Sequence, residues 1–150
     1  MAYDWARRNL DRHHAGVAAV NSEVVLHHAD ATIVHEHLLA HLNGQVDVVV
    51  TNPPYIPTNA VPRDPEVREF DPPAALYGGA DGLAVVRELV QVAWSLLHSG
   101  GVLVIEHSDQ QGESAGENGV PHVVRTAGFA AVEDHVDLAG RDRLTTAQRP

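Results

Sequence analysis

The residues Asn52, Pro53, Pro54 and Tyr55 directly follow an apolar run, and their types can bind a flat nitrogen group. An asparagine amide offers an acceptor and two donors, so Asn52 can hold a planar NH2 group. Proline has no N–H donor and its φ is fixed at roughly −65°, which fixes the direction of the Pro53 carbonyl as a second acceptor. Tyr55 adds an aromatic face. The four residues therefore predict a slot for an amide or an aromatic amine.

Such a slot suits the transfer of an alkyl group to a poor nitrogen nucleophile. An amide nitrogen shares its lone pair with the carbonyl, so the site must orient it toward an electrophilic methyl carbon. Hydrogen bonds to both N–H groups would strengthen as the nitrogen becomes positive, which stabilises the transition state more than the bound substrate. The alternative is a proline-rich turn that only ends a strand.

The elements next to this tetrapeptide should place it at the rim of a sheet. The β-branched run over 46–51 is typical of a central parallel strand covered on both faces. Ligands of open α/β sheets bind outside the carboxyl ends of the strands, and Asn52 stands at such an end. A long loop over 58–82 follows, and Asp81 can cap a helix over 83–98.

The rest of the chain alternates between helix and strand patterns, which argues for one layered α/β domain over residues 1–150. No internal repeat or linker divides it. The predicted elements are a helix over 4–13, a strand over 23–28, a helix over 35–42, a strand over 102–106, a glycine-rich loop over 112–119, a short helix over about 121–128, and two antiparallel strands over 129–138 and 144–147.

Composition excludes several classes of protein. The net charge of −10 argues against a face for duplex DNA, since phosphates need a clustered basic surface. The chain has no cysteine, which excludes disulfides and thiolate metal sites. Its 11 histidines do not make the zinc-protease spacing, because Leu39 stands where the second histidine would be. We therefore predict no metal site.

No stretch approaches the roughly 20 apolar residues of a membrane span. The first residues, MAYDWARRNLDRHH, are charged and amphipathic, without the apolar centre of a signal peptide. The sequence thus predicts a cytoplasmic protein that does not contact the membrane.

Several spaced motifs carry a family resemblance. The run D-V-V-V-T-N-P-P-Y-I-P resembles motif IV of the S-adenosylmethionine-dependent amino-methyltransferases, which act on glutamine, adenine or cytosine nitrogens. The later motifs resemble the release-factor glutamine methyltransferases (the PrmC/HemK family), and they are Glu66-Val67-Arg68, Asp71-Pro72, Gly78-Gly79, Asp81-Gly82-Leu83, Arg87 and Asp137-Leu138-Ala139-Gly140-Arg141.

The resemblance implies a Rossmann-like class I methyltransferase sheet and a reaction. The reaction would methylate the side-chain amide nitrogen of the glutamine in the Gly-Gly-Gln (GGQ) loop of peptide-chain release factors, with S-adenosylmethionine as donor. Asn52 would contact both the substrate amide and the cofactor, while Pro53, Pro54 and Tyr55 would shape the slot. Asp30, with Ala31 beside it, matches the acidic residue near the adenine; its alternative role is a helix cap.

The chain also departs from the family pattern. The family's N-terminal helical domain, its first two strands and its glycine-rich D-x-G-x-G turn have no counterpart in these 150 residues. We therefore expect a partial catalytic domain with an incomplete sheet and crippled activity. The absent strands would lie between the strand ending at Asp30 and the one ending at Asn52, so both would have edges open to self-association. Residues 107–111 (HSDQQ) replace a more apolar segment.

Two other functions remain alternatives. A DNA or RNA adenine N6-methyltransferase would share the Asn-Pro-Pro-Tyr chemistry, although the acidic balance and the release-factor-type loop count against it. An inactive truncated paralogue that acts only as a binding module is the non-enzymatic alternative.

Overall fold

The computed structural model describes residues 2–150 and divides them into two compact units, which meet between Asp30 and Ala31. The first unit contains helix α1 (Ala2–Ala19), which confirms and extends the helix predicted over 4–13. The Tyr3 and His28 rings stack with their centroids 5.0 Å apart, so the chain after α1 returns to the start of that helix.

The strand predicted over 23–28 is wrong. This segment has no regular secondary structure, and Val24 and Val25 are 52% and 63% exposed. A β-branched run becomes a strand only where a neighbouring strand accepts its backbone hydrogen bonds. No strand within residues 2–150 pairs with this segment.

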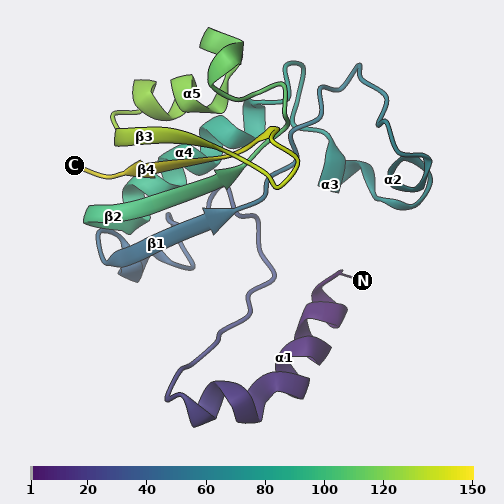
Figure 1. Cartoon of the computed structure of the whole chain (residues 1–150). Helices are drawn as coiled ribbons and strands as arrows, with labels where there is room; N and C mark the ends of the chain where they lie inside the picture. The colour runs from purple at the N-terminus through teal and green to yellow at the C-terminus, as the bar shows by residue number, and fades with distance from the viewer. Residues whose placement is uncertain (1) are drawn as a thin grey trace. The chain divides into compact units, whose positions relative to one another are not determined.

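The second unit contains an open four-stranded sheet, shown in Figure 1, whose strand order is β1-β2-β4-β3. Strands β1 (Val46–Thr51) and β2 (Leu97–Glu106) run parallel, whereas β2 pairs antiparallel with β4 (Asp142–Gln148), which pairs antiparallel with β3 (Ala130–Val136). The α/β class and the C-terminal antiparallel pair are as predicted.

Helices α4 (Ala84–Leu96) and α5 (Val120–Thr126) lie on the same face of this sheet (Figure 1). The stripe on α4, the central residues of β2 and the inner face of α5 form one core between the two layers. Its buried residues are Leu83, Val86, Val90, Ala93, Leu97, Leu103, Ile105, Val120, Val124, Phe129 and Ala147.

Strand β1 is not covered on both faces, contrary to the expectation from its apolar sequence. It is the outermost strand of the sheet, and Val48 and Val50 are 52% and 72% exposed. Of its residues, Val46 and Val49 pack against the core. The run has the apolar composition of a central strand, but within residues 2–150 it lies at the edge of the sheet.

The helix predicted over 35–42 is also wrong, because turns over 31–39 lead only to a short 3-10 helix, η1 (Ala40–Leu42). The end of this segment is fixed by another helix: the N–H groups of Gly44 and Gln45 donate to carbonyls in the last turn of α4, at 2.9 and 3.1 Å.

The long loops contain more structure than the sequence predicted. Two short helices, α2 (Pro65–Phe70) and α3 (Pro73–Leu76), lie between β1 and α4, and each begins with a proline in its first turn. The glycine-rich segment over 112–119 contains a 3-10 helix, η2 (Glu113–Asn118). Within residues 2–150 no helix combines the length and the apolar character needed to cross a bilayer.

Candidate functional site

The Asn-Pro-Pro-Tyr turn begins one residue after β1 ends at Thr51, at the carboxyl end of the parallel pair. Asn52 is exposed, and its side-chain amide has no hydrogen-bond partner among residues 2–150. Pro53 is buried, while Pro54 and Tyr55 are half-buried. No described donor bonds the Pro53 carbonyl. The turn therefore combines a fixed backbone with unused hydrogen-bonding groups.

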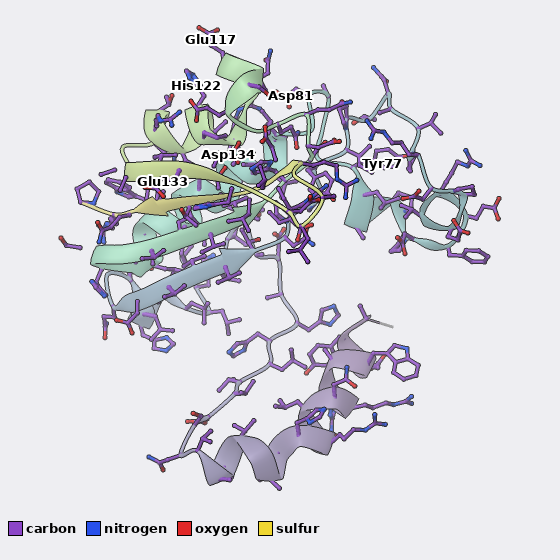
Figure 2. The ribbon with its side chains drawn as sticks, viewed as in Figure 1. Tyr77, Asp81, Glu117, His122, Glu133 and Asp134 are labelled. Carbon is purple, nitrogen blue, oxygen red and sulfur yellow. The ribbon has the colours of Figure 1, made fainter. Side chains whose placement is uncertain are left out.

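The turn is held by the loop that precedes α4. The Ile56 N–H donates to the Leu76 carbonyl at 2.9 Å, and the Gly78 N–H donates to the Ile56 carbonyl at 2.9 Å. Ile56 thereby forms an isolated parallel bridge with Tyr77, which Figure 2 shows beside α3. Ile56, the residue after the tetrapeptide, is thus held through both its N–H and its carbonyl.

Two glycines let this loop approach the turn closely. A Cβ at Gly78 would lie 2.4 Å from the Pro54 carbonyl oxygen, and a Cβ at Gly82 would lie 2.3 Å from the Tyr55 carbonyl oxygen. Gly82 also has φ +76°, a conformation that L side chains rarely adopt. Only glycine fits at these positions without moving the backbone of the turn.

Asp81 fixes the same loop to the start of α4 (Figure 2). Its Oδ1 accepts the Leu83 N–H at 2.9 Å, and its Oδ2 accepts a guanidinium N–H of Arg87 at 2.6 Å. The Arg87 hydrogen bond, and then the Leu83 N–H, hold the pKa of Asp81 below its ordinary value. Asp81 precedes this helix as predicted, but it is not its cap: the helix begins at Ala84, the N-cap residue is Leu83, and Asp81 accepts the N–H of that residue instead of a first-turn N–H.

The sequence analysis missed Gln111, which follows the end of β2. Its side chain is buried, and its Nε2 donates to the Tyr55 carbonyl at 3.2 Å. The carboxyl ends of adjacent parallel strands meet at one edge of a sheet. That rule predicts that the residues after β2 lie near the turn after β1. It does not predict which of their side chains contacts the turn.

The two residues predicted to contact the adenine lie at the boundary between the two units. Asp30 is the last residue of the first unit, and Ala31 is the first residue of the second. Both are exposed. Asn52, Pro53, Pro54 and Tyr55 lie together in the second unit, so the structure brings together the four residues of the amide slot, and Asp30 belongs to a different unit.

A cavity of about 640 Å³ lies elsewhere in the second unit. Residues of α4, η2 and α5 line it, including Arg87, Glu88, Glu117 and His122. None of its lining residues belongs to the Asn-Pro-Pro-Tyr turn. No group of three or more histidine, aspartate or glutamate side chains in the described part of the chain could hold a metal ion.

Comparison with known proteins gave curated relatives, although no family model matches the chain. Each relative is named release factor glutamine methyltransferase. The protein of Bifidobacterium longum is 43% identical over 96% of this chain and 47% of its own length. The protein of Mycobacterium tuberculosis H37Rv is 43% identical over 99% of this chain and 43% of its own length. The protein of Streptomyces coelicolor is 41% identical over 99% of this chain and 47% of its own length.

The chain therefore spans about half the length of the curated relatives it matches. Among solved structures, a possible exported protein from Bordetella parapertussis matches with a TM-score of 0.52 and 18% sequence identity, over 93% of this chain and 48% of that chain. A match at this identity supports the fold alone.

Proposed function

We propose that this chain, which spans about half the length of the release factor glutamine methyltransferases to which it is similar, contributes the glutamine-binding part of a methyltransferase site. The acceptor would be the side-chain amide nitrogen of the glutamine in the GGQ loop of a peptide-chain release factor. Asn52, Pro53, Pro54 and Tyr55 would bind that amide.

One observation carries this proposal: the exposed Asn52 amide and the Pro53 carbonyl have no partners, beside a turn that is otherwise fixed. The Asn52 carbonyl oxygen and the Pro53 carbonyl oxygen can each accept one N–H of a glutamine amide. Tyr55 can stack against its plane.

S-adenosylmethionine would supply an electrophilic methyl carbon bonded to a sulfonium sulfur. The glutamine nitrogen would form the new C–N bond while the C–S bond breaks, and the electron pair of the C–S bond would pass to sulfur, leaving a neutral thioether. The two acceptors hold the nitrogen's lone pair toward the methyl group and stabilise the positive charge that develops on the nitrogen. The surplus proton then passes to water, so no strong base is needed.

The residues present fit the methyl acceptor, a glutamine amide, better than the methyl donor, S-adenosylmethionine. We propose that Asp30 and Ala31 contact the adenine, as the family resemblance implies. The 150 residues contain no D-x-G-x-G turn, the kind of glycine-rich backbone that approaches a cofactor closely. We therefore propose that this chain alone binds S-adenosylmethionine weakly and transfers methyl groups slowly.

The test is methyl transfer from labelled S-adenosylmethionine to a GGQ peptide and to a release factor. We expect label on the glutamine, at a rate that rises in proportion to the S-adenosylmethionine concentration without saturating. Asn52→Ala should abolish transfer. Asn59→Ala removes an exposed amide from the same loop and should leave the rate unchanged.

Two outcomes would overturn the proposal. Label on an adenine oligonucleotide but not on the peptide would support the adenine methyltransferase instead. A folded chain that transfers no label, and gives no heat with S-adenosylmethionine in a calorimeter, would support the inactive binding module.

A further inference from the structure

We propose that Gln111 is a positioning residue, which fixes the Asn-Pro-Pro-Tyr turn by holding the Tyr55 carbonyl. The inference rests on the proposed function only where it concerns catalysis. Gln111 lies 56 positions from Tyr55 in the sequence and does not belong to the tetrapeptide. It would act through the backbone of the turn and not through a contact with substrate.

The side chain of Gln111 bridges the residues that follow two parallel strands. Its Nε2 donates to the Tyr55 carbonyl at 3.2 Å, and its Oε1 accepts the Ser108 N–H at 3.2 Å. Tyr55 follows β1, and Ser108 follows β2. The side chain is only 6% exposed, so water does not readily replace either bond.

The two partners also fix which way the amide faces. A backbone carbonyl can only accept a hydrogen bond, and a backbone N–H can only donate one. The NH2 group of Gln111 must therefore face Tyr55, and its oxygen must face Ser108. The reverse orientation would break both bonds.

The backbone of Gln111 is itself held at both ends. Its N–H donates to the Ser108 carbonyl at 2.9 Å, and its carbonyl accepts the N–H of Val120, the first residue of α5, at 2.7 Å. One position before Ser108, His107 is fully buried, and its Nε2 lies 3.1 Å from the Asp134 carboxylate on β3. Gln111 thus extends from a rigid segment toward the turn.

The prolines pass this constraint to Asn52. Pro53 and Pro54 lie between Asn52 and Tyr55, and each has only ψ free to rotate. A shift of the Tyr55 carbonyl cannot be absorbed by φ rotation at either proline. The position of the Asn52 amide therefore depends on the bond between Gln111 and Tyr55.

The test compares Gln111→Glu with Gln110→Glu in the full chain. At position 111 the new carboxylate still accepts the Ser108 N–H, but it places an acceptor against the Tyr55 carbonyl. At position 110 the same change falls on an exposed side chain. The readout is amide hydrogen exchange together with the NMR resonances of the Asn52 side-chain NH2 group.

We expect Gln111→Glu to speed exchange about tenfold at the amides of Ile56 and Gly78, which anchor the turn. The Asn52 NH2 resonances should shift, while the amides of Leu103 and Ile105 in the core of β2 keep their protection. Gln110→Glu should change none of these. A merely structural role would instead raise exchange throughout the core.

Unchanged exchange at Ile56 and Gly78 in Gln111→Glu would overturn the inference, as would an equal effect of the two variants. If Gln111→Glu does not fold, Gln111→Met replaces it, because methionine keeps the volume and loses both hydrogen bonds. The same local increase in exchange is then expected, and its absence overturns the inference.

A kinetic measurement extends the test to methyl transfer. At one fixed S-adenosylmethionine concentration, Gln111→Glu should lower the apparent kcat for the GGQ peptide by about 10-fold to 100-fold with the KM for the peptide unchanged, because a misplaced amide binds but reacts poorly. A rise in KM alone would overturn the positioning role. If the unmodified chain transfers no methyl group, the proposed function fails, while the exchange experiment still decides the role of Gln111.

Discussion

The His107 imidazole and the Asp134 carboxylate form a buried pair that joins the residue after β2 to strand β3. The Nε2 of His107 lies 3.1 Å from Oδ1 of Asp134, and the side chains are 0% and 8% exposed. The second carboxylate oxygen accepts the Glu113 N–H at 2.6 Å. One carboxylate therefore pairs with a histidine that water cannot readily reach and also accepts an N–H at the surface.

Removing this carboxylate should destabilise the fold. Asp134→Ala leaves the buried His107 Nε2 without its partner, so we expect the free energy of unfolding to fall by about 1–3 kcal/mol. Asp134→Asn keeps an acceptor of the same size and should cost less. Urea unfolding of the two variants measures the difference, and equal losses would contradict the role of the carboxylate.

The close approach of Gly82 to Tyr55 should make alanine costly there. Gly82 and Gly140 have nearly the same positive φ, +76° and +75°, but only Gly82 has neighbours within 4 Å of an added Cβ. Gly140→Ala should lower the free energy of unfolding by about 1–2 kcal/mol through backbone strain alone. Gly82→Ala should cost clearly more, because the Cβ would overlap the Tyr55 carbonyl. Thermal unfolding of both variants compares them, and equal losses would refute the contact.

The turn between β3 and β4 should give the fold an acid-sensitive contribution. The Arg141 N–H, and with it the Arg141 side chain and the Ala139 N–H, lower the pKa of Asp137 from 3.8 to about 2. A folded-state pKa below the unfolded value adds stability at higher pH. That stability is lost as the pH falls through the interval between these two values.

Asp137→Asn tests this dependence. The variant should be less stable than the unmodified chain above about pH 4, and the gap between the two should close as the pH falls toward about 2. Chemical unfolding at several pH values measures it. Parallel curves over this range would mean that Asp137 titrates alike in the folded and unfolded states.

The exposed face of β1 should promote self-association. Val50 is 72% exposed on the outermost strand, and Val49 on the opposite face packs against the core. Val50→Lys should change the free energy of unfolding by less than about 0.5 kcal/mol while reducing association, because a lysine on an edge strand discourages pairing. Val49→Lys should destabilise the fold by placing a charge against the core.

Sedimentation over a range of protein concentrations measures self-association separately from the stability of the fold. The unmodified chain should form larger species as its concentration rises, and Val50→Lys should remain smaller. Identical behaviour of the two proteins would show that β1 does not mediate association.

The spacing of apolar residues predicted those elements of the second unit that bury one face against segments close in the sequence. The apolar stripe of α4 and the paired strands β3 and β4 follow directly from their patterns. The segment over 23–28 has the same β-branched character and forms no strand, because strand formation needs a partner as well as a propensity.

The candidate site likewise has one part that the sequence predicts and one part that it does not. Asn52 and Tyr55 lie together because they are neighbours in the sequence, and the apolar run before them predicted the end of a strand. The contact between Gln111 and Tyr55 joins loops after two different strands, and one sequence gives no register for side chains so far apart. A glutamine among polar residues also reads as a solvated loop until its burial is known.

Strand β4 lies between β2 and β3, although residues 142–148 follow both in the sequence. Strand β2 can therefore complete its pairing on that side only when the hairpin that contains β4 has formed. Pairing between segments so far apart in the sequence is expected to slow folding.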